Sequence, residues 1–208
     1  MLVEAAVESL GAAQAATEGG AHRIELCADL AHGGTTPPLE LPTVPIPVYV
    51  LVRPRAGDFV YTAAEHRVML EQIRQAKAAG ARGIVTGALT RAGQVDVERT
   101  AELIAAARPL GVTFHRAIDA STSITAALET LIELGVDRVL TSGGATTAVL
   151  GVETIGRLVM QAAGRIAILA GGGIDASNAA RIVQETGAQE IHFSVKTAQK
   201  VRDVLESL

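Results

Sequence analysis

The 208-residue sequence contains no tryptophan, only two tyrosines and three phenylalanines, and a single cysteine, Cys27. So few aromatic side chains leave little surface on which bases or sugar rings could stack. One cysteine cannot form a disulfide within the chain, and no basic, apolar leader is visible, so we expect a reducing, cytoplasmic location. No apolar run approaches membrane-spanning length, and we therefore expect no membrane partner.

Other absences exclude whole classes of chemistry. The 18 Lys and Arg residues are balanced by 22 Asp and Glu and form no basic block, which argues against a nucleic-acid partner. None of the three lysines, Lys77, Lys196 and Lys200, is expected inside a strand, so a Schiff-base enzyme is disfavoured. HExxH, CxxC and GxGxxG motifs are all missing, and we predict neither a zinc site nor an organic cofactor.

What the sequence does contain is a regular alternation of β-rich runs with alanine-rich amphipathic stretches, repeated about eight times. Several helix-like stretches end at a glycine that precedes the next strand, as in "EGGAHRIEL", "AAGARGIV", "ELGVDRVL" and "ETGAQEIH". Glycine fits the left-handed C-cap that ends many helices. This pattern predicts one (β/α)₈ barrel domain over residues 1–208, with an open doubly wound sheet as the structural alternative. The expected strands are Val3–Val7, Arg23–Cys27, Val48–Arg53, Gly83–Gly87, Val112–His115, Arg138–Ser142, Ile166–Ala170 and Glu190–Ser194.

One repeat departs from the pattern. Prolines at positions 37, 38, 42, 45 and 47 exclude an ordinary helix over 39–47, because proline removes a backbone donor and clashes with the preceding turn. We therefore predict an abridged second helix. The other helices are expected at Leu10–Glu18, Ala63–Ala79, Val97–Ala107, Ile124–Leu134, Val149–Ala162 and Ser177–Glu185, followed by a final helix.

Chemistry in such barrels gathers at the C-terminal ends of the strands. Side chains alternate along a strand, so outward Phe114, Ile191 and Phe193 would leave His115 and His192 inside. We expect Glu4, Glu25, Arg53 and both histidines to share one cavity. The candidate catalytic residues are Glu25, Arg53, His115, Arg116, Asp119 and His192. The alternative is that these groups are only buried ion pairs that fill a narrow barrel mouth.

Two glycine runs at the ends of the sixth and seventh predicted strands form a second signal. Glycine lets the backbone approach a ligand, and free N–H groups at a helix start favour an anion. We predict an anion site formed by Arg53, Ser142, Gly143, Gly144, Gly171, Gly172 and Gly173. The alternative is that these glycines only permit tight turns.

Six ordered motifs resemble the CutC family of copper homeostasis proteins: "GGAHRIELCADLAHGGTTP", "VRPRAGDFVY", "GALTRAGQVDVERT", "VTFHRAID", "LGVDRVLTSGG" and "AGGGI…IHFS". The resemblance runs from Glu4 to about Ser194. It implies a (β/α)₈ barrel, a cytoplasmic location, a homodimer and a role in copper handling. The segment 37–47 and the tail after Ser194 look shorter than the family pattern.

Two functional classes follow. The resemblance implies copper binding, for which Cys27 is the candidate ligand because a thiolate suits Cu(I). The residues themselves also fit an isomerase or lyase, in which Arg53 and the glycine loops hold a small phosphorylated or carboxylated substrate. In that alternative, Glu25 and His115 exchange protons with it.

Overall fold

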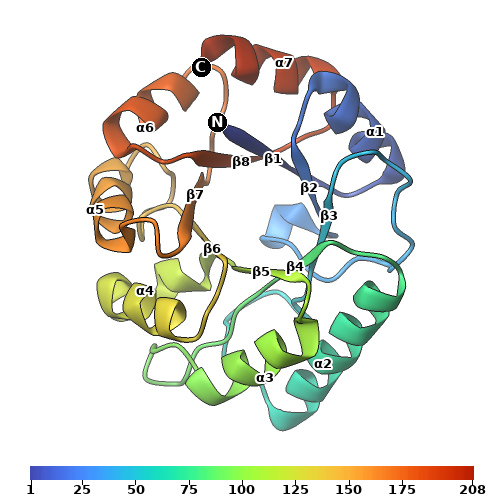
Figure 1. Cartoon of the computed structure of the whole chain (residues 1–208), viewed down its shortest axis with the longest axis vertical. Helices are drawn as coiled ribbons and strands as arrows, with labels where there is room; N and C mark the ends of the chain where they lie inside the picture. Colours follow the sequence, from blue (N-terminus) through green and yellow to red (C-terminus); the bar gives the residue numbers. More distant parts are fainter.

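The computed structural model describes residues 1–208 as a closed ring of eight parallel strands surrounded by helices (Figure 1). Each strand pairs with the next one along the chain, and β8 pairs with β1, so the sheet has no free edge. This closure confirms the predicted barrel over the open sheet. The strands are β1 (Leu2–Val7), β2 (Arg23–Leu26), β3 (Val48–Leu51), β4 (Gly83–Thr86), β5 (Gly111–Phe114), β6 (Arg138–Thr141), β7 (Ala167–Gly171) and β8 (Glu190–Ser194).

Seven α-helices form the outer layer, and polar residues fix where they begin. For example, Thr62 and Glu65 form a reciprocal capping box at the start of α2. Glycine ends the predicted repeats as expected, because Gly20, Gly80, Gly135 and Gly187 all have positive φ. None of the helices combines the length and hydropathy needed to cross a membrane. The helices are α1 (Leu10–Gly19), α2 (Ala63–Ala78), α3 (Val97–Ala107), α4 (Ile124–Glu133), α5 (Val152–Ala162), α6 (Ala179–Thr186) and α7 (Ala198–Ser207).

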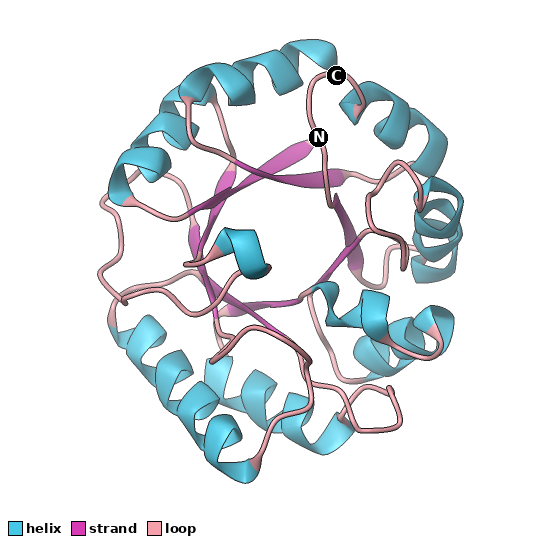
Figure 2. Cartoon of the chain, turned by 180° about the vertical axis from the view of Figure 1, so that it is seen from behind, coloured by secondary structure: helices cyan, strands magenta, loops and turns pink.

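The second repeat lacks its helix, as the prolines predicted. Only one short 3₁₀ helix, η1 (Leu30–His32), follows β2, and the rest of the connection to β3 is irregular. In Figure 2, η1 lies across the opening of the barrel. The proline-rich connector still covers the core, because its half-buried apolar side chains pack against it. These are Leu39, Leu41, Val44 and Ile46.

Alternation along the strands divides the interior into two regions. Phe114, Ile191 and Phe193 point outward into the apolar layer beneath the helices, as predicted. Inside the barrel, Ala6, Cys27, Leu51 and Val85 form a separate, smaller apolar cluster. Polar and charged side chains lie elsewhere within the ring of strands.

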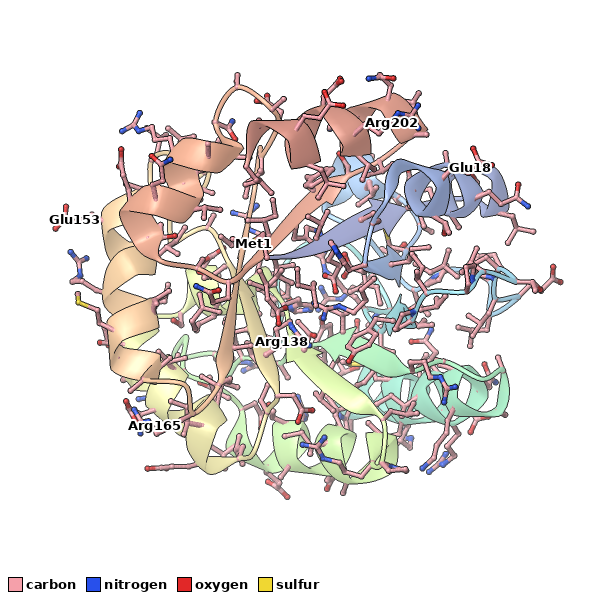
Figure 3. The ribbon with its side chains drawn as sticks, turned by 45° about the horizontal axis from the view of Figure 1, so that its top comes forward. Met1, Glu18, Arg138, Glu153, Arg165 and Arg202 are labelled. Atoms are coloured by element: carbon pink, nitrogen blue, oxygen red, sulfur yellow. The ribbon has the colours of Figure 1, made fainter.

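The N-terminal end of the barrel is closed by Tyr49 and an ion network. A Cβ atom at Gly83 or Gly111 would lie 2.3 Å from a Tyr49 ring or hydroxyl atom, so a larger residue at either position would displace the Tyr49 ring. The guanidinium groups of Arg23 and Arg138 flank the same ring, at 5.0 and 5.9 Å from its centroid. Both arginines pair with Glu190, and Figure 3 shows Arg138 within the ring of strands. We call the opposite end of the barrel the mouth.

Candidate functional site

A cavity of about 330 Å³ lies at the mouth. Most of the predicted catalytic residues line it, from strands that are distant in sequence: Glu25, Arg53, His115, Arg116 and His192. Asp119 does not line this cavity and lies beside it, bonded to Arg116. The structure thus brings the predicted residues together, while their chemical roles remain predictions.

At the bottom of the cavity, His192 lies between two buried carboxylates. Its Nδ1 is 2.8 Å from Glu4 Oε1, and its Nε2 is 3.3 Å from Glu25 Oε2. Glu4 also accepts a hydrogen bond from Arg23. One potential ligand atom from each of Glu4, Glu25 and His192 lies within 4.8 Å of the others. This group combines oxygen and nitrogen donors that could hold a metal ion.

The pKa values of the two carboxylates in this group are shifted in opposite directions. Burial raises the pKa of Glu25 to about 7, with the Glu4 charge acting in the same direction and the charges of His192 and Arg23 opposing it. Burial also disfavours the charged form of Glu4, yet the bonds from His192 and the Arg23 charge lower its pKa to about 2. Although burial opposes it, Glu25 and Glu4 raise the pKa of His192. Glu25 and His192 can therefore share one proton near neutral pH.

His115 is held as a neutral imidazole. It follows β5 and its Nδ1 accepts the backbone N–H of Ala117, 3.2 Å away, so the ring proton lies on Nε2. Burial and the Arg53 charge lower its pKa to about 3. Its Nε2 is buried and has no hydrogen-bond partner within the protein. An Nε2–H without an acceptor suits donation to a ligand oxygen better than the proton exchange predicted for this residue.

Arg53 is bound to backbone oxygens. Its Nη1 donates to the carbonyls of Gly33 and Gly34 at 3.0 and 2.8 Å, and its Nη2 donates to Gly57 at 2.8 Å. No carboxylate lies within ion-pair distance of it. Arg53 therefore fixes two loops over the mouth, and its charge remains without a negative partner.

The β6 loop, residues 142–144, is bonded to an internal carboxylate. Asp119 accepts the N–H groups of Ser142 and Gly144, both at 3.0 Å, and it also pairs with Arg116. The N–H of Gly143 donates to Thr141 Oγ1. These three amides are therefore directed away from the cavity. An external anion at the predicted site would have to compete with Asp119 for the amides of Ser142 and Gly144.

The β7 loop, residues 172–174, faces the cavity. Gly172 and Gly173 have φ of 108° and 72°, a region that favours glycine, and both line the cavity. Gly171 ends β7, where a Cβ would lie 2.6 Å from Leu140. The helices that follow the two glycine runs were predicted to begin at Val149 and Ser177, and both begin slightly later than that. The helices α5 and α6 begin only at Val152 and Ala179, because irregular turns follow both loops.

Cys27 lies inside the barrel but outside the cavity lining. Its side chain is buried beside Ala6, Leu51 and Val85, and its Sγ lies 3.4 Å from the carbonyl oxygen of Val7. Burial and the Glu25 charge raise the pKa of this thiol. Neither a second cysteine nor a methionine lines the cavity, so the thiol has no soft partner there.

Phe59 and Lys200 are among the cavity residues that were not predicted from the sequence. The Phe59 ring centroid lies 4.9 Å from the Arg53 guanidinium and 4.9 Å from the His115 ring, to which it is tilted by 50°. Lys200, in the first turn of α7, lines the mouth from the side of β8. A signal for Lys200 was present, because it is one of only three lysines and follows the last strand.

The model of the CutC family matches residues 1–197. The chain belongs to the CutC family. The human "Copper homeostasis protein cutC homolog" is 48% identical over 203 residues, which cover 95% of this chain and 74% of the human protein. A CutC family protein of Xanthomonas campestris is 49% identical over 201 residues, covering 94% and 84% of the two chains.

A solved structure supports the same assignment. The crystal structure of the putative copper homeostasis protein CutC from Streptococcus agalactiae superposes with a TM-score of 0.87 at 34% identity, covering 92% of this chain and 97% of that one. The CutC relationship supports the copper homeostasis interpretation and gives no support to the isomerase or lyase alternative.

Proposed function

We propose that this protein acts in copper homeostasis and binds copper at the mouth of the barrel. The family relationship supports the biological role, since relatives with that name share almost half of its residues. The observation that carries the site is the convergence of Glu4, Glu25 and His192, whose potential ligand atoms lie within 4.8 Å of one another.

Within this group, His192 Nε2 and Glu25 Oε2 are the proposed ligands. Both residues line the cavity and are accessible to an incoming ion. Glu4 holds the other ring nitrogen of His192, an arrangement that orients many metal-bound histidines and raises their basicity. Nitrogen and oxygen donors of this kind suit Cu(II). Two protein ligands leave further positions for water, so we expect an exchangeable ion.

Cys27 is the alternative ligand and would select Cu(I). Binding there requires loss of the thiol proton, and burial opposes that loss. The neighbouring side chains inside the barrel are apolar, so further ligands would have to come from elsewhere. The two candidate copper sites therefore differ in the substitution that should abolish binding and in the oxidation state of the copper that they would bind.

We expect His192→Asn to weaken Cu(II) binding about 100-fold, because it removes the proposed nitrogen ligand. Glu25→Gln should weaken it as well, whereas Cys27→Ser should leave it unchanged. The matched control is His32→Asn, since His32 is an exposed histidine bonded to Asp29. Affinities would be measured by competition with a chromophoric chelator, for Cu(II) and, under ascorbate, for Cu(I).

Two results would overturn this assignment. If Cys27→Ser abolishes Cu(I) binding and His192→Asn changes nothing, the metal lies at Cys27. If wild-type protein binds neither oxidation state more tightly than His192→Asn and Cys27→Ser do, direct copper binding is not its function.

We also propose a cytoplasmic homodimer. The unpaired Cys27 is compatible with a reducing compartment. Leu150 and Met160 are each 73% exposed and lie just before and within α5, which supports a contact there. Sedimentation should give twice the 21.4 kDa chain mass, and Met160→Lys should reduce it. A wild-type mass of one chain would contradict the dimer.

A further inference from the structure

The two glycine loops differ in how their backbone donors are used. In the β6 loop, the two oxygens of the Asp119 carboxylate accept the N–H groups of Ser142 and Gly144, so amides in this kind of loop bind an anion. The adjacent β7 loop also contains consecutive glycines with positive φ.

The β7 loop has no such internal acceptor. The N–H groups of Gly172, Gly173 and Ile174 donate to no atom of the protein, whereas that of the next residue, Asp175, donates to Asn178 Oδ1. All three residues of the loop line the mouth cavity. Three consecutive amides without acceptors form an anion-binding concavity of the kind found in phosphate sites.

Positive charge accompanies these amides. Lys200 lines the same cavity and forms no ion pair within the protein. Arg116 lies on the other side of the loop, where a Cβ at Gly172 would be 3.6 Å from its Cζ. Arg116 uses Nε and Nη2 for Asp119 and Ser142 and leaves Nη1 free. Asp175 also lines the cavity, and its carboxylate accepts bonds from Ser177, which together with the nearby Lys200 charge lower its pKa.

A separate donor lies elsewhere in the cavity. The buried Nε2–H of His115 has no partner, and the charge of Arg53 beside it is not neutralised by a carboxylate. The cavity volume of about 330 Å³ exceeds what a phosphate group alone requires. A ligand could therefore place an anionic group on the β7 loop and a neutral oxygen near His115.

We infer that the mouth binds a small phosphate monoester, with its phosphate on the amides of Gly172, Gly173 and Ile174 and on Lys200. A hydroxyl or carbonyl oxygen of the same molecule accepts the Nε2–H of His115. This inference goes beyond copper handling and requires no metal, so it stands or fails separately from the proposed copper site.

The direct test is an amide NMR titration of metal-free protein with inorganic phosphate, glycerol phosphate and acetate. The Gly172, Gly173 and Ile174 signals should shift saturably with both phosphates, and the Gly144 signal should not, because Asp119 already holds that amide. Glycerol phosphate should bind about fivefold more tightly than inorganic phosphate, since only the ester can reach His115.

Single substitutions test separately the contacts of the phosphate group and those of the rest of the ligand. Lys200→Gln should weaken both phosphates about tenfold, while Lys196→Gln, a change at an exposed lysine outside the cavity, should not. His115→Phe should cancel the advantage of glycerol phosphate and leave inorganic phosphate binding intact. No saturable shift at the β7 loop, equal binding of acetate, or an unchanged affinity in Lys200→Gln would each refute the inference.

Discussion

Replacing Asp119 by alanine is expected to lower the free energy of unfolding by about 2 to 3 kcal/mol. The carboxylate accepts two backbone N–H groups of the β6 loop and the Ser142 hydroxyl, and it pairs with Arg116. Its removal leaves the amide and hydroxyl of the buried Ser142 without this acceptor, so their desolvation penalty is unopposed, whereas the exposed Gly144 amide and the partly exposed Arg116 can bind water instead. Urea unfolding followed by circular dichroism would measure the loss.

The control for Asp119 is Asp203→Ala on α7. Asp203 accepts a single bond from Gln199 on an exposed helix face, so we expect a change within about 0.5 kcal/mol. Formate supplies a second check, because it can occupy the space left in Asp119→Ala and accept the same amides. Formate should restore part of the stability of this variant only. Equal losses in both variants would show that Asp119 is not the acceptor on which the β6 loop depends.

The second large effect concerns pH. Glu25 has an ordinary pKa of 4.5 and a folded pKa of about 7, so between these values the folded protein retains a proton that the unfolded chain releases. Stability from this group is therefore present below pH 4.5 and lost as the pH rises to 7. Glu25→Gln cannot titrate, and its stability relative to wild type should increase by about 3 kcal/mol across that range.

The measurement is urea unfolding of metal-free protein at pH 4.5 and 7.5. His192 reinforces the sign, because Glu25 raises its pKa and the folded state therefore also binds its proton more tightly. His115 is present in both proteins and cancels in the difference. Glu98→Gln, on the exposed face of α3, should follow wild type. A constant difference between Glu25→Gln and wild type at both pH values would contradict the prediction.

The barrel was predictable because four of its strands, β2, β4, β6 and β8, carry two independent local signals. Glycines such as Gly20 and Gly187 end a helix, and the β-branched run that follows begins a strand within a residue or two of the expected position. The alternation of Phe114 with His115 then predicted which side chains enter the barrel. The missing second helix followed from prolines alone.

The contacts at the mouth were not predictable from the sequence, because they join residues of different loops whose relative positions no local pattern indicates. Arg53 binds the carbonyls of Gly33 and Gly57, and no residue type marks a backbone carbonyl as a partner. Asp119 and Ser142 are 23 residues apart, and their contact depends on the short 3₁₀ helix η2 (Arg116–Ala120). Both glycine runs looked alike in sequence, yet only the β7 loop keeps free amides, because only the β6 loop lies against a carboxylate.

The pairing of β1 with β8 determines when this site can exist during synthesis of the chain. Glu4 and His192 are register partners across that seam, although 188 residues separate them in sequence. On the ribosome, β1 emerges first, and one of its edges has no hydrogen-bonding neighbour until β8 has been translated. Glu25, Cys27 and Arg53 are therefore present long before the ring closes around them. A nascent chain that stalls before β8 carries Glu25 but lacks His192, the other proposed copper ligand, and Lys200 of the proposed phosphate site, and it presents an open sheet edge for chaperones to shield.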